Sequence, residues 1–266
     1  MNYSEGVKTA YPQGVQAKEF ILPKELLEQD CVISLSKMKT HALERITGAV
    51  KNSYGFVYGF HKAKGHTQYP SADSFARMLI DLNKCVAPKL YVMDGIVAME
   101  GNGPGSGDPV PMNVLLMSTD PVALDSVFSR LVYLKPEMVP TNYHGEKMGL
   151  GTWKEEEITL LTPDGEISMA EAVKKYGNPA FNVDRTEVRK NIWTRMAGAL
   201  NIFQKKPYIE ADKCVRCGIC VQSCPVPGKA VDFRKGKGKP PVYDYRKCIR
   251  CFCCQEMCPK KAIKVK

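Results

Sequence analysis

The chain has 266 residues, of which 44% are hydrophobic, and a formal net charge of +10. This length suits one domain of medium size and one small domain. Because no apolar run reaches the ~18 residues of a membrane helix, and the N-terminus lacks a basic head followed by an apolar stretch, we expect a soluble, cytoplasmic protein without a membrane span.

Strand and helix patterns alternate through the first half of the chain. Apolar runs at 32–36, 89–94 and 113–118 are typical of buried strands. Apolar residues at helical spacing follow at 71–86 and 120–134, and each of these segments opens with a capping residue. This alternation predicts an α/β domain with a mostly parallel sheet flanked by helices.

Basic residues gather after the first predicted strand. Between Lys37 and Lys64 there are six Lys and Arg against one acid, Glu44. In open α/β sheets ligands bind beyond the carboxyl ends of the strands, which is where this stretch lies. The positive charge therefore indicates a carboxylate or phosphate ligand. A solvated basic face is the alternative.

Three histidines, His41, His61 and His66, fall within the same stretch. A metal site would need two of them to converge with a carboxylate such as Asp94 or Asp120. The chain has no His-Glu-x-x-His motif and no pair of histidines four residues apart, so structural or surface histidines are the alternative.

Several segments of this region together resemble a known family. They are Ser36-Lys-Met-Lys-Thr-His41, Thr47-Gly-Ala-Val-Lys-Asn52, Gly101-x-Gly-Pro104 and Asp120-Pro-Val-Ala-x-Asp125. With them, the sequence from Val32 to Leu134 looks like domain-of-unknown-function family 362, in which fusion to a two-cluster ferredoxin is typical. The family has no settled reaction. Its members usually have more chain before the first matched strand, so the resemblance implies a sheet that is incomplete on its N-terminal side.

A shorter resemblance concerns His41, Lys51 and His66. They are spaced much like the histidine, lysine and second histidine around the nickel-pincer cofactor of lactate racemase. This resemblance implies that Lys51 binds or carries a cofactor and that His66 is a metal ligand or an acid/base group.

The predicted ligand site combines the basic stretch, a glycine-rich loop at 94–108 and two aspartates. Lys51, His41 and His66 are the candidate catalytic residues, because they could hold the anion or move protons. The residues expected to bind the ligand or cofactor are Lys37, Lys39, Asn52, Gly101, Gly103, Asp120 and Asp125.

The pattern weakens after Gly151 and then changes. Apolar residues at roughly helical spacing predict a helix at about 184–203 that joins two domains, and Lys205, Lys206 and Pro207 mark the boundary. We therefore expect an α/β domain at 1–206 and a small α+β ferredoxin-like domain at 207–266.

Nine of the eleven cysteines lie in this second domain. The run C-x2-C-x2-C-x3-C-P occurs twice, and each cysteine of the first run recurs 34 positions later. It is the bacterial ferredoxin signature, in which three thiolates hold one 4Fe-4S cluster and the fourth ligates the other. It predicts one cluster on Cys214, Cys217, Cys220 and Cys258, and a second on Cys248, Cys251, Cys254 and Cys224.

Other uses of the cysteines fit less well. Zinc sites usually take paired knuckles that lie far apart, and disulfides belong to oxidising compartments. The ninth cysteine, Cys253, precedes Cys254, and the repeat aligns it with Ile219 rather than with a cysteine. We therefore predict that Cys253 is a buried residue that does not ligate a cluster.

The second domain is also basic. Residues 207–266 carry 14 Lys and Arg against 5 Asp and Glu. Because an oxidised cluster with four thiolates carries about −2, part of this charge balances the cofactors. This weakens a nucleic-acid interpretation, although the basic segment 234–239 could dock an acidic partner. A solvated hairpin tip is the alternative.

The leading hypothesis is an iron-sulfur oxidoreductase or its electron-transfer subunit. Two clusters would pass single electrons to or from a small anionic substrate or cofactor in the α/β domain. A redox partner protein or a small redox cofactor would complete the exchange. Two alternatives stay open: the α/β domain only docks a partner enzyme, or the clusters are structural in a non-redox enzyme that uses an additional metal or anionic cofactor.

Overall fold

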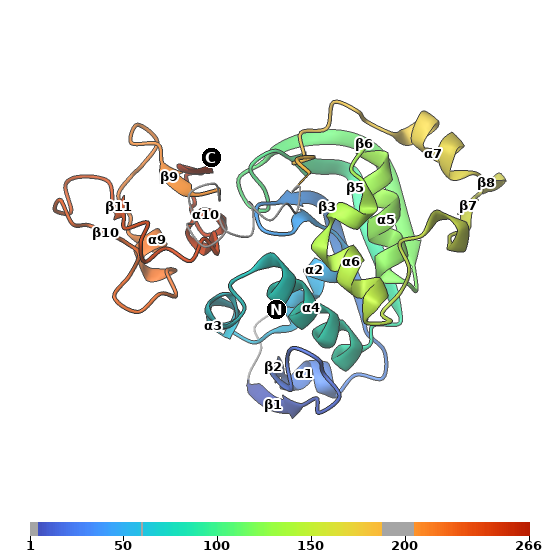
Figure 1. The fold of residues 1–266 in the computed structure, drawn as a ribbon, viewed down its shortest axis with the longest axis horizontal. Helices are drawn as coiled ribbons and strands as arrows, with labels where there is room; N and C mark the ends of the chain where they lie inside the picture. The colour runs from blue at the N-terminus through green and yellow to red at the C-terminus, as the bar shows by residue number, and fades with distance from the viewer. Residues whose placement is uncertain (1–4, 60, 188–204) are drawn as a thin grey trace, which may run out of the picture.

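The computed structural model describes residues 5–59, 61–187 and 205–266. Figure 1 shows a larger part, formed by the residues up to 187, and a smaller part, orange to red, formed by the residues from 205 onward. The predicted joining helix at about 184–203 falls almost entirely outside the described residues.

A four-stranded sheet in the order β4-β3-β5-β6 forms the centre of the larger part. Neighbours β3 and β5 run parallel, whereas β3 with β4 and β5 with β6 are antiparallel. The sheet is therefore mixed, and the prediction of a mostly parallel sheet is wrong. The strands are β3 (Ile33–His41), β4 (Arg45–Thr47), β5 (Leu90–Glu100) and β6 (Asp108–Ser118).

Two short connections explain the mixed topology. Parallel neighbours need a crossover of a dozen or more residues, but residues 42–44 join β3 to β4 and residues 101–107 join β5 to β6. The glycines at 94–108 predicted a long loop. Instead β5 continues to Glu100, with an irregularity between Gly95 and Val97, and only the last part of the segment turns.

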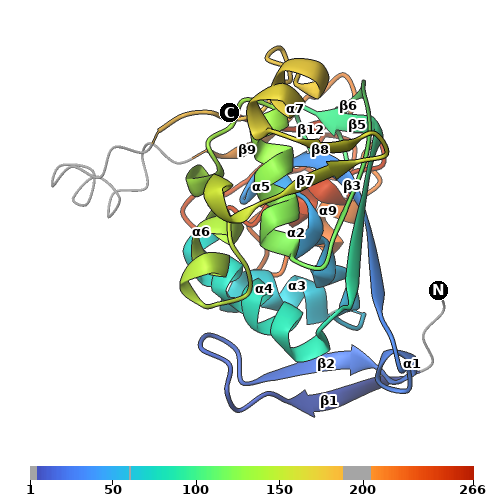
Figure 2. The same ribbon diagram turned by 90° about the vertical axis from the view of Figure 1, so that its right-hand side faces the viewer.

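Helices cover one face of this sheet (Figure 2). The longest, α4, begins at a capping box between Ser71 and Ser74 and buries the predicted apolar stripe, including Phe75 and Leu79. The helices on this face are α2 (Ala49–Asn52), α4 (Ala72–Val86), α5 (Pro121–Leu131) and α6 (Pro140–Lys147).

The two faces of the sheet differ in burial. Met38 and Met93 point toward the helices and are fully buried, whereas Leu35 is 71% exposed and Met117 62% exposed. This alternation is typical of a sheet that packs on one side. The main hydrophobic core therefore lies between the sheet and the helices.

Shorter elements complete the larger part. An N-terminal hairpin packs beside α1, and a second hairpin precedes α7. Their bounds are β1 (Gly6–Ala10), β2 (Glu19–Pro23), α1 (Lys24–Leu27), η1 (Ser53–Phe56), α3 (His61–Gln68), η2 (Pro136–Met138), η3 (Glu155–Glu157), β7 (Leu160–Thr162), β8 (Gly165–Ile167) and α7 (Met169–Tyr176).

The smaller part consists of two strand pairs and two short helices. β9 pairs with β12 and β10 pairs with β11, both antiparallel. The elements are β9 (Pro207–Ile209), α9 (Ile219–Gln222), β10 (Val231–Asp232), β11 (Val242–Tyr243), α10 (Cys253–Glu256) and β12 (Ile263–Val265).

The 34-residue sequence repeat extends to the backbone of the smaller part. Arg216 and Arg250 have φ angles of 60° and 57°, and Gly218 and Phe252 have φ angles of 78° and 60°. Each pair is separated by the repeat length and lies in the left-handed region that few residues adopt. The two cysteine loops therefore turn in the same way.

Asp125 connects α5 to the start of α2. Its side chain is fully buried and accepts hydrogen bonds from the backbone N–H groups of Ala49 at 2.5 Å and Val50 at 3.1 Å. Burial raises the pKa of this carboxyl to about 7. Because α2 carries Lys51 and Asn52, Asp125 holds the segment that presents them.

We expect Asp125→Ala to lower the free energy of unfolding by about 3 kcal/mol, because two buried N–H groups lose their acceptor. Asp125→Asn should cost less, since the amide oxygen can still accept one bond. Chemical denaturation of the iron-loaded protein measures both. Exposed Asp164→Ala is the control, and equal stability of the Asp164 and Asp125 alanine variants would contradict this role.

Candidate functional site

One cysteine group surrounds a cavity in the smaller part. Cys214, Cys217, Cys220 and Cys258 all line one small cavity. These are the four cysteines that the sequence predicts for the first cluster. Four thiols around one cavity form the soft donor set that suits an iron-sulfur cluster.

The second cysteine group is more deeply buried. Cys224, Cys251 and Cys254 are buried and Cys248 is partly exposed. The hydroxyl of Tyr243 donates a hydrogen bond to the Cys254 sulfur at 3.1 Å. Donors to the sulfurs are among the means by which a protein sets cluster potentials.

Cys224 and Cys258, the fourth cysteines of the two runs, have similar surroundings. The N–H of Ala230 donates to the Cys224 sulfur and the N–H of Ala262 donates to the Cys258 sulfur, both at 3.3 Å. Each of these thiols therefore accepts one backbone hydrogen bond, from a donor six residues after Cys224 and four residues after Cys258.

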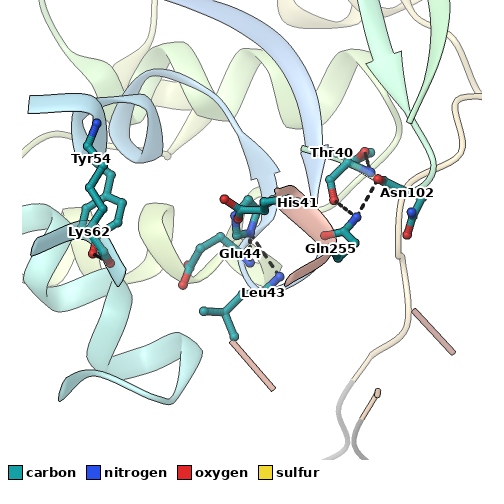
Figure 3. A network of polar contacts seen from close by, with 10 residues as sticks. Thr40, His41, Leu43, Glu44, Tyr54, Lys62, Asn102 and Gln255 are labelled. Atoms are coloured by element: carbon teal, nitrogen blue, oxygen red, sulfur yellow. Dashed lines mark hydrogen bonds and ion pairs between the residues drawn. The ribbon is translucent and has the colours of Figure 1, made fainter. Parts of the chain in front are cut away.

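The glycine-rich turn between β5 and β6 docks onto α10 of the smaller part. Gln255 is fully buried and donates through Nε2 to the carbonyl oxygens of Asn102 at 2.8 Å and Gly103 at 3.0 Å (Figure 3). Asn102 in turn donates to the Ile263 carbonyl at 3.0 Å. A Cβ at Gly103 would collide with the backbone of Thr40. Glycine is therefore needed for close packing at position 103.

His41 provides a second link between the parts. Its Nδ1 accepts hydrogen bonds from the backbone N–H groups of Leu43 and Glu44, both at 3.1 Å (Figure 3). The ring proton must then lie on Nε2, which faces Glu256 Oε1 at 3.1 Å. Burial, reinforced by the charge of Lys51, lowers the pKa of His41 to about 4. His41 is therefore a neutral donor that holds Glu256.

A cavity of about 680 Å³ lies beside this link, between the two parts. The larger part contributes three lysines, Lys39, Lys51 and Lys62, together with the side chain of His66. The smaller part contributes residues of α9 and α10. The full lining is Lys39, Thr47, Lys51, Asn52, Tyr54, Gly55, Gly59, Lys62, His66, Ile219, Gln222, Ser223, Cys253, Glu256 and Met257. We call this space the inter-domain pocket.

Positive charge dominates the inter-domain pocket. Burial lowers the pKa of Lys39 and of Lys62, and the charge of Lys51 lowers both further. Although burial alone would raise the pKa of Glu256, Lys51 and the hydrogen bond from His41 hold it well below its usual range. The lining thus sets three lysines against one carboxylate, and that carboxylate is already bonded to His41.

Two buried polar atoms of the pocket wall lack a hydrogen-bond partner in the structure. They are Thr47 Oγ1 and His66 Nδ1, on side chains that are 2% and 4% exposed. The His66 ring stacks on Phe75 with centroids 4.6 Å apart and meets the edge of Tyr54. Buried polar groups are nearly always paired, so these atoms mark positions where a ligand could bond.

The structure brings together only some of the residues predicted from sequence. Lys39, Lys51, Asn52 and His66 line the inter-domain pocket, and His41 supports it from behind through Glu256. Lys39, Lys51 and His66 therefore lie around the same pocket.

The remaining candidates lie elsewhere. Lys37 is exposed on the outer face of the sheet and pairs with Asp94 at 2.6 Å. Gly101 and Gly103 line a different, polar cavity. Both Asp120 oxygens are used, because Oδ1 caps α5 and Oδ2 accepts from the N–H of Thr152 at 2.9 Å. Asp125 supports α2, so neither aspartate faces the pocket.

A metal site that joins the histidines to Asp94 or Asp120 does not fit this arrangement. Asp94 bonds Lys37 and the N–H of Ile96, and Asp120 caps a helix. Across the described ranges, no three His, Cys, Asp or Glu side chains are close enough to hold a single metal ion.

Sequence reasoning missed Thr47, Tyr54, Glu256 and the buried Glu44. Both carboxylate oxygens of Glu44 are buried without a partner in the structure, and burial raises its pKa well above the usual value. Glu256 lies between two cysteines of the ferredoxin signature, so only the docking of the two parts reveals it. An isolated acid within the basic stretch was the one available signal for Glu44.

Two family models match separate regions of the chain. Residues 1–130 match the family described as Domain of unknown function (DUF362), and residues 206–259 match the 4Fe-4S dicluster domain. The family resemblance predicted from the sequence is confirmed. The dicluster match supports iron-sulfur electron transfer, and the other match gives no substrate.

One curated relative is similar to about half of this chain. It is the Thylakoid-associated protein sll1697 of Synechocystis sp., 42% identical over 130 residues, which make up 48% of this chain and 40% of the relative. The matched region thus spans less than half of the relative's length. No solved structure matches the chain. Within the described residues, no helix combines the length and apolar composition of a membrane-spanning segment.

Replacement of Cys253 should test the predicted cysteine assignment. Its side chain is buried and lines the inter-domain pocket rather than the cavity of the first cysteine group. We expect Cys253→Ala to retain about eight Fe per chain and Cys254→Ala to retain about four or fewer. Iron analysis after anaerobic reconstitution measures both. Equal iron loss in the two variants would contradict the assignment.

His66 should make stability depend on pH. Burial lowers its pKa to about 4, below the ordinary value of 6.5, so protons bind the unfolded chain first as the pH falls. The stabilisation is complete above pH 6.5 and is lost toward pH 4.

Relative to His66→Phe, the wild type should lose about 2 kcal/mol of unfolding free energy between pH 7.5 and pH 5. Anaerobic denaturant titrations of iron-loaded protein at both pH values give this difference. A wild type and variant with parallel pH profiles would rule out a neutral, buried His66.

Proposed function

We propose that this chain is an iron-sulfur oxidoreductase, in which two 4Fe-4S clusters exchange single electrons with a small anionic molecule bound in the inter-domain pocket. One observation carries the proposal. The pocket joins a cationic wall that has unpaired polar atoms to a wall built from α9 and α10, the helices that contain or adjoin the cluster cysteines.

The sequence repeat and the cavity support one partition of the cysteines. Cys214, Cys217, Cys220 and Cys258 would hold the first cluster, and Cys224, Cys248, Cys251 and Cys254 would hold the second. When bound, such clusters supply one-electron chemistry, while the protein sets their potentials through hydrogen bonds and burial. The ferredoxin domain would span 207–266 and the α/β domain 1–206.

The charge of the lining describes the ligand. Lys39, Lys51 and Lys62 are opposed only by Glu256, whose carboxylate already accepts from His41. A ligand with about two negative charges would offset this excess, and carboxylate or phosphate groups match lysine ammonium donors. Desolvation strengthens such pairs.

The shape and polarity of the lining add an apolar body to this ligand. Tyr54, Ile219 and Met257 provide apolar surface, while Thr47 Oγ1 and His66 Nδ1 provide two fixed hydrogen-bonding positions. The cavity of about 680 Å³ lies within the range of small-molecule sites. Lys51 Nζ and His66 Nδ1 are the groups placed to exchange a proton with the bound molecule.

The place of the protein in the cell stays a prediction. The sequence leads us to expect the cytoplasm, whereas the printed name of the Synechocystis relative describes an association with thylakoids. That name belongs to the relative, and the expectation for this chain is a soluble electron-transfer protein with a separate redox partner.

Loss of the lysine or of the unpaired hydroxyl should release the ligand. We expect anaerobically purified wild type to yield about one equivalent of an anionic small molecule after denaturation. Lys51→Met and Thr47→Val should each retain at least about tenfold less, because each removes a buried partner worth about 1.5 kcal/mol or more. Mass spectrometry of the extracts measures the amount.

Lys37→Met serves as the matched control, since Lys37 lies on the outer face of the sheet. It should retain as much ligand as the wild type, and all variants should keep their iron. When the extracted molecule is added back to reduced wild type, the clusters should be reoxidised. In Lys51→Met the same addition should reoxidise the clusters more slowly. The proposal would be refuted if all variants yielded the same amount of the anionic molecule. It would also be refuted if adding the molecule did not change the rate of cluster oxidation.

A further inference from the structure

The two cysteine groups differ in their access to solvent. In the first group Cys217 is exposed, and its neighbour Val215 is 53% exposed. In the second group Cys251 and Cys254 are buried. The edge at Cys217 is therefore the part of the cluster-binding region that another protein can approach most closely.

The buried group lies on the side of the α/β part. Cys253, which lies between Cys251 and Cys254, is buried, and Gln255 on the same helix donates to the carbonyl oxygens of Asn102 and Gly103 in the larger part. Tyr54 and Cys253 both line the inter-domain pocket. The loop of the second cysteine group thus borders the pocket through Cys253, while Cys217 of the first group is open to solvent.

Basic side chains surround the exposed edge. Arg216 Nη1 donates to the Gly238 carbonyl at 2.7 Å, which ties the tip of the β10-β11 hairpin to the first cysteine loop. Lys260 lines the cavity of the first group from the other side. We call the exposed cations Arg216, Lys235, Lys237, Lys239 and Lys260 the basic rim.

Nearby acids offset this charge only in part. Glu210 is paired with Lys213 at 2.7 Å, and Asp244 is paired with Arg234 at 3.4 Å. Neither acid pairs with a member of the basic rim in these contacts. The rim therefore presents a concentrated positive surface around a thiol that is open to solvent.

We propose that the basic rim docks an acidic protein that carries a low-potential flavin or iron-sulfur centre. One electron leaves the reduced centre of that protein and enters the first cluster, and no bond forms or breaks. The buried second group then lies between the entry point and the inter-domain pocket. This inference concerns the entry of electrons and does not depend on the ligand of the pocket.

Charge and exposure together favour this partner over a nucleic acid. A rim that only bound phosphates would not require an exposed cysteine and the apolar Val215 at its centre. Electron transfer requires close approach, and opposite charges raise the rate of productive encounter. A rim that only balanced cluster charge would leave the reduction rate insensitive to the charge of the donor.

The test uses iron-loaded full-length protein and a fully reduced acidic flavodoxin as the electron donor. Stopped-flow absorbance follows cluster reduction at about 20 mM and about 500 mM salt. The double variant Lys237→Glu/Lys239→Glu should be reduced about tenfold more slowly at low salt, and the difference should vanish at high salt. Lys174→Glu/Lys175→Glu on α7 is the control and should match the wild type.

Two further readouts keep the result independent of turnover. Carbodiimide cross-linking of oxidised flavodoxin should join its carboxylates to Lys237, Lys239 or Lys260, as mapped by mass spectrometry. Reduction by a small neutral dye should be equal in all proteins. Lys235→Glu, at the exposed tip, replaces the double variant if that protein loses iron.

Three results would overturn the proposal. Flavodoxin could reduce the wild type and the rim variants at equal rates, or the cross-links could be confined to other lysines. The rim could also bind duplex DNA while the protein does not respond to flavodoxin. This test is separate from that of the proposed function, because it measures reduction of the clusters by flavodoxin and not retention of an anionic molecule in the inter-domain pocket.

Discussion

The docking of α10 onto the larger part is the constraint on which the rest of the structure depends. Two consecutive residues provide it. Gln255 donates to two carbonyl oxygens of the β5-β6 turn, and Glu256 accepts from His41. Because Cys254 and Cys258 flank this pair, the same contacts that join the parts also position two of the cysteines proposed to bind clusters. Without them there would be no second wall for the inter-domain pocket.

The contacts that dock α10 also explain how the pocket keeps its positive charge. Three lysines facing one space repel one another, and burial adds to the cost of charging them. Glu256 offsets part of that cost, but its bond to His41 directs the carboxylate toward the domain junction. The remaining excess charge and the unpaired Thr47 and His66 atoms are the features on which the proposed anion site depends.

Local features of the sequence predicted local structure well. The Ser71 cap and the apolar stripe that follows it gave α4, and Asp120 with Pro121 gave the start of α5, because capping and helical spacing act within a few residues. Cysteine spacing gave the two loops for the same reason. Features that depend on packing between distant segments were predicted poorly, as the mixed sheet and the roles of Gly101 and Gly103 show.

His41 illustrates why the site could be predicted only in part. A histidine in a basic stretch indicates catalysis or ligand binding, and no local signal shows that two backbone N–H groups will occupy its Nδ1. Its partner Glu256 lies 215 residues away in sequence. Lys51 and His66 were recognisable by their surroundings in sequence, but the wall opposite them belongs to a segment recognisable only for its cysteines.

The two cysteine groups of the smaller part differ in their exposure to solvent. Two halves related by a 34-residue repeat have equivalent loops and, in each, one backbone hydrogen bond to the fourth cysteine. Their surroundings differ, because only the second loop continues into Gln255 and Glu256, which bury it against the larger part. At the equivalent positions the first loop has Val221 and Gln222, and its Cys217 is exposed. Two side chains of α10 thus give the two halves of a sequence repeat different surroundings, one open to solvent and one beside a cationic pocket.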